Sequence, residues 1–145
     1  MLVAIGSDHG GFRLKEEIKL FLNENGIAFR DFGTNSTESV DYPDVSRAVA
    51  QAVSGGQYDR GIIVCGTGVG VSIAANKVKG IRAALCHDVY SAEMSRAHNN
   101  ANVLTMGERV IGFGLARAIV AKWMSTEFEG GRHARRVAMI DALVE

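Results

Sequence analysis

A cysteine at the head of a glycine-rich loop is the first candidate for chemistry in this sequence. The apolar run 62–65 ends in Cys65, and glycines follow at alternate positions: Gly66, Gly68 and Gly70. The run predicts a strand buried on both faces, and the glycines let the backbone approach a ligand closely before a helix begins. Backbone N–H groups there can bind an anion, and the positive end of the helix dipole can stabilise a Cys65 thiolate. This short segment therefore offers both a base and an anion hole.

The same residues also permit other roles. A cysteine that ends an apolar strand is most often a small buried hydrophobe, and Cys86 fits that description. The Gly-x-Gly-x-Gly run resembles part of a dinucleotide fingerprint with Asp88 near the acidic position, although that fingerprint normally follows the first strand. A nucleotide-binding module is therefore the rival hypothesis. A cysteine-phosphatase loop is excluded, because its Cys-x5-Arg pattern needs an arginine where this chain has Val71.

Composition sets broad limits on the class of protein. The 145 residues fit one domain, 1–145, and 16 basic residues balance 16 acidic ones, so no strong charge favours nucleic acid or an anionic membrane. No basic leader precedes the first apolar run, and no apolar run approaches the roughly 18 residues of a membrane span. We therefore expect a cytoplasmic protein with no nucleic-acid or membrane partner. Its two cysteines form no disulfide framework, and no Cys/His spacing indicates a structural zinc site.

Strand and helix patterns alternate almost throughout the chain. Apolar runs predict strands over 2–6, 27–32, 60–65, 82–86 and 103–106, and helical periodicity predicts helices over 12–25, 42–53, 89–97, 112–125 and 132–143, with a further helix after the glycine loop. This alternation predicts an α/β fold with a five-stranded parallel sheet in the order 2-1-3-4-5 and helices on both faces. In that order the ligand crevice opens at the carboxyl ends of the first and third strands. Those ends carry Asp8, His9 and Cys65.

Four polar residues outside the glycine loop have two interpretations each. Asp8 and His9 can cap the helix that follows them, but their place at the predicted crevice favours ligand contact. His98 and Asn99 can form an ordinary helix C-terminus, where a cationic histidine and an asparagine are both favourable. The sequence alone leaves a structural and a functional role for His98 and Asn99 open.

Two arginines near the start of the last helix suggest a phosphate site. Arg132 and Arg136 stand four residues apart, so they share one face of that helix. Arginines at a helix N-terminus oppose its dipole, which argues against a purely stabilising role, and a pair of guanidinium groups suits a bidentate grip on phosphate. A solvated basic face is the alternative.

Five motifs together closely resemble the ribose-5-phosphate isomerase B family, which also includes isomerases of allose and galactose 6-phosphates. The resemblance covers essentially the whole chain. It rests on the motifs Gly6-Ser7-Asp8-His9-Gly10-Gly11, Asp41-Tyr42-Pro43-Asp44, Cys65-Gly66-Thr67-Gly68-Val69-Gly70, His98-Asn99-Asn100-Ala101-Asn102 and Glu129-Gly130-Gly131-Arg132.

The resemblance implies a Rossmann-like three-layer αβα sandwich and an aldose–ketose isomerase with no metal or organic cofactor. It implies Cys65 as the proton-transfer base and His98 as the acid/base that opens the sugar ring, with Thr67 and Asp8 in supporting catalytic roles. Some members use a glutamate farther along the loop as the base. The implied substrate contacts are Asp8, His9, Tyr42, Gly66, Thr67, Gly68, Val69, Gly70, Asn99, Arg109, Arg132 and Arg136.

The expected position of these residues predicts a homodimer with shared active sites. In a parallel sheet, loops after strands lie at one edge and loops after helices at the other. Cys65 follows a strand, whereas His98 and Arg132 follow helices, so a three- to four-turn helix separates them by roughly 15–20 Å. A two-fold partner would bring its own His98 and Arg132 to Cys65. The donor chain of Arg109, and the choice between a dimer and a dimer of dimers, stay open.

The residues are also compatible with two other functions that simple measurements distinguish. A nucleotide module would be stabilised thermally by an adenine nucleotide, and a non-catalytic sugar-phosphate sensor would bind the sugars without turnover. Preference for a pentose 5-phosphate or a hexose 6-phosphate depends on pocket depth, and a single carbon shifts discrimination only modestly.

Overall fold

One parallel sheet organises the molecule. In the computed structural model, which describes residues 1–144, the strands are β1 (Leu2–Ser7), β2 (Ala28–Asp31), β3 (Arg60–Cys65), β4 (Ala83–Leu85) and β5 (Val103–Gly107). Every paired strand runs parallel to its neighbour. The predicted α/β class is therefore confirmed, with each predicted strand present to within one or two residues. Of the predicted domain 1–145, only residue 145 lies outside the described residues.

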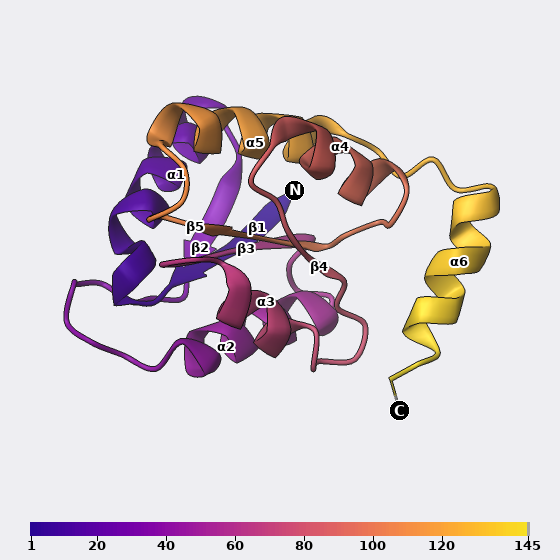
Figure 1. The fold of residues 1–145 in the computed structure, drawn as a ribbon, viewed down its shortest axis with the longest axis horizontal. Helices are drawn as coiled ribbons and strands as arrows, with labels where there is room; N and C mark the ends of the chain where they lie inside the picture. Colours follow the sequence, from indigo (N-terminus) through magenta and orange to yellow (C-terminus); the bar gives the residue numbers. More distant parts are fainter. Residues whose placement is uncertain (145) are drawn as a thin grey trace.

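Helices cover both faces of the sheet, as Figure 1 shows. They are α1 (Phe12–Glu24), α2 (Tyr42–Ser54), α3 (Val69–Ala75), α4 (Val89–Ala97), α5 (Phe113–Ser125) and α6 (Arg132–Asp141), with the short 3-10 helix η1 (His9–Gly11) before α1. One buried apolar cluster joins the sheet to α1, α4 and α5, and a second joins it to α2 and α3. Helix α6 stands apart from both layers (Figure 1).

The order of the last two strands corrects the sequence prediction. The sheet runs β2-β1-β3-β5-β4, not 2-1-3-4-5. All five residues of β5 are buried, whereas β4 has only three residues, none of them buried. A short, partly exposed strand suits the edge of a sheet, and a strand buried on both faces needs a neighbour on each side. Strand β5 accordingly pairs with both β3 and β4.

The exchanged order of β4 and β5 determines the face of the sheet on which α4 lies. Parallel crossover connections are right-handed, so the direction of each step across the sheet determines the face that its helix covers. The connections from β2 to β3 and from β3 to β4 cross the sheet in the same direction, so α2 and α3 lie on the same face. The step from β4 back to β5 runs the other way, so α4 joins α1 and α5. The predicted order would have placed α4 beside α3.

A fully buried lysine links α1 to β2 beneath the loop that follows β2. The Lys15 ammonium has no exposed surface and donates to both carboxylate oxygens of Asp31 at 2.9 Å, and also to the carbonyl of Thr34. Burial opposes ionisation of Asp31, but hydrogen bonds from Lys15, Lys19 and the Gly33 N–H lower its pKa. The pair therefore holds the start of this loop beside the end of β1, where Asp8 begins the candidate site.

We expect Asp31→Asn to lower the free energy of unfolding by about 3 kcal/mol, because it leaves the Lys15 ammonium buried without a counter-charge. The measurement is urea unfolding at neutral pH. Since the folded pKa of Asp31 is lowered, its contribution is complete above the pKa of an unfolded aspartate, about 4, and is lost as pH falls through the lower folded value.

Glu24→Gln is the matched control for this ion pair. Glu24 also pairs with a basic side chain, at 2.7 Å from Arg117, but its own side chain is 59% exposed. Exposed pairs contribute little, so this variant should unfold like the parent protein. Equal, small losses for the two variants would show that the Lys15–Asp31 pair does not stabilise the fold.

Candidate active site

Two loops meet at the carboxyl ends of β1 and β3. The Asp8 N–H donates to the Val64 carbonyl at 3.3 Å, which joins the first loop to the end of β3. The Asp8 carboxylate accepts the N–H groups of Gly10 at 2.9 Å and Gly11 at 3.2 Å, so it also caps the short helix η1. A Cβ on Gly11 would clash with the Val64 carbonyl and lie 2.8 Å from the Cys65 nitrogen. The absence of a side chain at Gly11 allows the loops to touch.

Cys65 lies at this junction. Its side chain is 5% exposed, and its Sγ accepts a hydrogen bond from the Gly68 N–H at 3.0 Å. Gly68 has a φ of +77°, and a Cβ there would lie 2.7 Å from the backbone of Met106. Only glycine fits both demands, so Gly68 directs a backbone donor at the sulfur. Such a donor stabilises negative charge on the atom that accepts from it.

The loop uses some of its own donors in this structure. Five backbone N–H groups, from Gly66 to Gly70, are the expected anion hole. The Gly68 N–H points to the Cys65 sulfur, and the Val69 N–H donates to the Thr67 Oγ1 at 3.2 Å. Thr67 therefore accepts a hydrogen bond within the loop, from the residue that follows the donor to the sulfur. An oxyanion here would be held first by the remaining N–H groups.

Other predicted residues of the same chain surround this loop. The Tyr42 ring lies against Gly70, where a Cβ would come within 2.6 Å of ring carbons. The Arg109 guanidinium lies 3.5 Å from the Cβ position of Gly66, and the backbone N–H of Arg109 donates to the Gly66 carbonyl at 3.1 Å. His9 accepts the Val40 N–H through Nδ1 at 3.2 Å. Arg109, whose donor chain the sequence left open, thus joins the cluster of its own chain.

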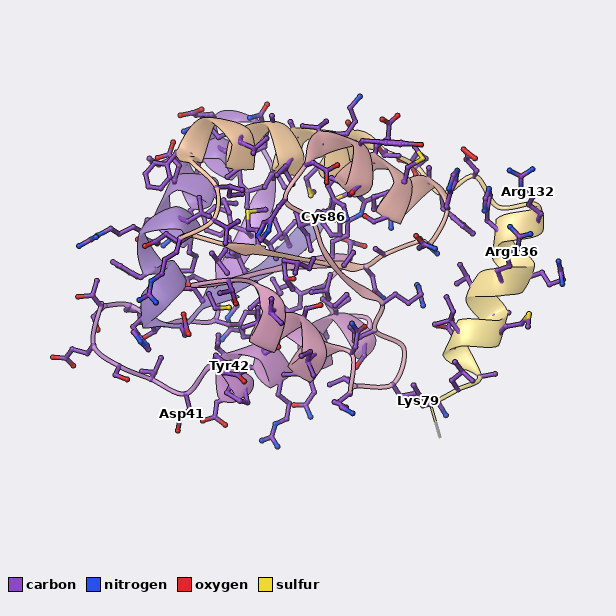
Figure 2. The ribbon with its side chains drawn as sticks, viewed as in Figure 1. Asp41, Tyr42, Lys79, Cys86, Arg132 and Arg136 are labelled. Atoms are coloured by element: carbon purple, nitrogen blue, oxygen red, sulfur yellow. The ribbon has the colours of Figure 1, made fainter. Side chains whose placement is uncertain are left out.

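The other predicted residues lie at the opposite edge of the sheet. His98 follows α4, and the Asn102 carbonyl just beyond it accepts the Gly61 N–H at 2.9 Å, near the start of β3. The four remaining residues of β3, at about 3.3 Å each, separate this point from Cys65 by roughly 13 Å. Figure 2 shows Arg132 and Arg136 on α6, far from Tyr42. Asn99 lines a cavity of about 400 Å³ between β4 and the end of α6.

Two arginines that the sequence analysis did not identify hold the loop after α4. Asn100 has a φ of +48°, an uncommon conformation for a residue other than glycine. Arg96 donates to the side-chain oxygen of Asn100, and Arg82 donates to the Asn100 carbonyl, both at 3.0 Å. Arg82 also pairs with Asp141 of α6 at 3.1 Å. Burial, followed by repulsion from Arg60, lowers the pKa of Arg96 to about 10, so it remains a cation at neutral pH.

The His98 ring stacks on a second histidine. Its ring centroid lies 4.1 Å from that of His133, with 9° between the planes, and Glu129 Oε1 is 3.7 Å from Nε2 of each ring. The three side chains offer ligand atoms within 4.8 Å of one another. A metal ion binds in the plane of an imidazole ring, and two nearly parallel rings have no such point in common. The arrangement therefore favours a histidine stack over a metal site. Sequence reasoning missed both Glu129 and His133 as partners of His98.

Two further residues support the Cys65 loop from the end of β5. The Glu108 N–H donates to the Cys65 carbonyl, and its carboxylate accepts the Leu14 N–H at 2.8 Å. His87 accepts the Gly107 N–H through Nε2 at 3.0 Å, and burial lowers the pKa of His87. Cys86 packs into the other core cluster, where burial raises the pKa of its thiol. Cys86 is therefore the small buried hydrophobe that its sequence context indicates.

Comparison with known proteins assigns the family. The ribose/galactose isomerase family matches residues 3–140. Ribose-5-phosphate isomerase B of Escherichia coli is 53% identical over 97% of this chain and 95% of its own length. D-erythrulose-4-phosphate isomerase of Pectobacterium atrosepticum is 47% identical over 95% and 91%. The structure of ribose-5-phosphate isomerase B of Clostridium thermocellum superposes with a TM-score of 0.97 at 58% identity, covering 99% of this chain and 97% of that one.

The fold and the cysteine–glycine loop define an α/β isomerase. The chain belongs to the ribose/galactose isomerase family, and among its members to the ribose-5-phosphate isomerase B group. Both the resemblance stated from the motifs and the expectation of an isomerase are thereby confirmed. Among residues 1–144, no helix is long and apolar enough to cross a membrane.

The contact between the two loops predicts the effect of a single added methyl group. Gly11→Ala should lower the free energy of unfolding by about 2–3 kcal/mol, because its Cβ meets backbone atoms that cannot rotate away. Gly114→Ala is the control, since a Cβ at that position in α5 meets nothing within 4 Å and should stabilise the helix by about 0.5 kcal/mol. Thermal unfolding measures both variants. Similar melting temperatures would contradict the close packing of the two loops.

Proposed function

We propose that this protein interconverts ribose 5-phosphate and ribulose 5-phosphate through an enediolate, with Cys65 as the proton-transfer base. The observation that carries the proposal is the Cys65 sulfur at the junction of the β1 and β3 loops, accepting the Gly68 N–H at 3.0 Å. Membership of the isomerase family, and 53% identity to the Escherichia coli ribose-5-phosphate isomerase B, support this substrate.

The reaction moves two protons and two electrons: one proton passes from C2 to C1 and a second passes from O2 to O1. In the forward direction the Cys65 thiolate takes the proton from C2 of the open-chain aldose, and negative charge develops on the oxygen of the former aldehyde. The proton on O2 passes to O1, and the thiol returns its proton to C1, which yields the ketose. Backbone N–H groups of the glycine loop stabilise the oxyanion, an interaction worth roughly 3–4 kcal/mol for one good donor. Thr67 orients this loop through its bond with Val69.

Ring opening precedes that proton transfer. Ribose 5-phosphate closes a five-membered ring, so an acid must protonate the ring oxygen while a base removes the O1 proton. We assign the acid to His98. Asp8 uses one carboxylate oxygen for the Gly10 and Gly11 N–H groups, which leaves the second oxygen for a sugar hydroxyl. His9 and Tyr42 border the same loops and are assigned to substrate contact.

We propose that each active site is shared between two subunits of a homodimer. Within one chain, Cys65 lies at one edge of the sheet and four of the assigned residues lie at the opposite edge: His98, Asn99, Arg132 and Arg136. One sugar phosphate therefore cannot contact Cys65 and these four residues of the same chain. A partner placed antiparallel would bring these residues to the glycine loop, with the arginines on the phosphate. Helix α6, which stands apart in Figure 1, and the turn after it have exposed apolar side chains suited to a partner: Met139 and Ile140 on the helix and Leu143 beyond it. Binding at the distant phosphate would help to position C1 and C2.

The isomerase assignment predicts which cysteine is essential. The parent protein should convert ribose 5-phosphate to ribulose 5-phosphate, and Cys65→Ala should abolish turnover while retaining sugar-phosphate binding, because only the base is removed. Cys86→Ala is the matched control and should remain active. Coupled initial rates and calorimetric binding provide the two measurements.

Each failure of this experiment has its own meaning. Binding without turnover by the parent protein would indicate a sensor, and thermal stabilisation by an adenine nucleotide alone would indicate the nucleotide module. Faster turnover of erythrulose 4-phosphate or a hexose 6-phosphate would revise the substrate and leave the Cys65 chemistry intact. An active Cys65→Ala variant would overturn the assigned base.

Mixed dimers test the shared site. Cys65→Ala and His98→Ala chains, each inactive alone, are unfolded together and refolded, so random pairing makes half of the dimers mixed. A mixed dimer holds one intact site and one doubly altered site, which gives about a quarter of the parent activity. If mass spectrometry verifies mixed dimers and no activity returns, each chain must hold its own complete site.

A further inference from the structure

The stack of His98 on His133 restrains a ring that is otherwise free to turn. His98 caps the end of α4, and its side chain is 38% exposed. His133 lies in the first turn of α6 and is 9% exposed, so its ring is held by its surroundings. An imidazole rotates broadly about its χ2 bond unless a neighbour restricts it. The parallel contact at 4.1 Å sets the plane of the His98 ring and thus the direction of its nitrogen atoms.

Glu129 ties the same two residues together from a third direction. Its N–H donates to the Ala97 carbonyl at 3.0 Å, beside His98, and its Oε1 lies 3.7 Å from Nε2 of both rings. Burial, then the neighbouring His98 and Arg132, lowers the pKa of His133. A neutral His133 can stack on His98 without repelling a proton that His98 carries.

We infer that His133 and Glu129 are positioning residues for ring opening: the His133 ring orients His98, and the Glu129 carboxylate, which lies beside Nε2 of both rings, holds the two rings in this arrangement. The inference rests on the proposed function, in which His98 opens the sugar ring. In that step the protonated His98 gives its proton to the ring oxygen as the bond from C1 to that oxygen breaks. The O1 hydroxyl gives its proton to a base, for which Asp8 is placed, and the aldehyde forms. In this role His133 acts through His98 and needs no contact with the substrate.

Two reactions of the same enzyme separate ring opening from proton transfer. Conversion of ribose 5-phosphate to ribulose 5-phosphate needs both steps. Exchange of the C1 proton of ribulose 5-phosphate with D₂O, followed by NMR, needs only the Cys65 chemistry. Ribulose 5-phosphate forms no five-membered ring, because the hydroxyl that would close it carries the phosphate. A residue that merely holds the fold together would affect both reactions equally.

His133→Ala should lower kcat for ribose 5-phosphate roughly 10-fold or more, because a misaligned acid loses part of the gain typical of general acid catalysis. The KM should change little, and C1 exchange should stay within about twofold of the parent rate. His133→Phe, which keeps a flat ring for His98 to stack on, should recover most of the forward rate. Glu129→Gln should lower the forward rate and leave exchange unchanged.

His98→Ala separates failure of this inference from failure of the proposed function. If it slows ribose 5-phosphate turnover and spares exchange, His98 is the ring-opening acid. Equal slowing of both reactions by His133→Ala, or no effect on either, would then overturn the positioning role alone. If His98→Ala slows both reactions equally, or the parent protein catalyses neither, the proposed function itself fails. Circular dichroism confirms that each variant is folded.

Discussion

The carboxyl ends of parallel strands all lie at one edge of the sheet, and this constraint decides which polar residues of the chain can meet. Strands β1 and β3 are neighbours, so their following loops bring Asp8 to Cys65. Glycines make the contact close enough for backbone donors to reach the sulfur. His98 follows a helix and must lie at the other edge. One chain therefore carries Asp8 and Cys65 at one edge of the sheet and His98 at the other, and the proposed active site needs both groups.

Much of this architecture could be predicted because apolar runs and helical periodicity are local signals. They located every strand and helix to within a few residues, and the neighbours β1 and β3 were correctly predicted. The order of β4 and β5 was wrong because it depends on a comparison between distant segments. The sequence does contain the relevant signal: Ala83–Leu85 is short and weakly apolar, whereas Val103–Gly107 can be buried on both sides. Right-handed crossover then places α4, and with it His98, on the face of α1 and α5.

The site was predictable to the extent that its residues lie within short motifs. Cys65 and Asp8 each follow a strand, and the structure brings their loops into contact as expected. The orientation of individual donors was not predictable, since the Gly68 N–H reaches the sulfur in a loop where Gly68 has a φ of +77° and Met106 leaves no room for a side chain. Glu129 precedes α6, and His133 lies in the first turn of that helix. Their contact with His98 requires the end of α4 to lie beside the start of α6, and no local sequence pattern predicts that contact.

The end of α4 and the whole of α6 are joined by several independent contacts. The Glu129 N–H bonds to Ala97, the histidine rings stack, and Arg82 links the Asn100 carbonyl to Asp141. In the proposed shared site, the ring-opening acid and the phosphate-binding arginines therefore belong to one rigid unit of one subunit. A bound phosphate would place the sugar relative to His98 through contacts inside that unit. Its position relative to the Cys65 base would depend on how the two subunits pack. In this proposed arrangement, binding energy at the phosphate would promote proton transfer only through the interface, because the acid and the base would belong to different chains.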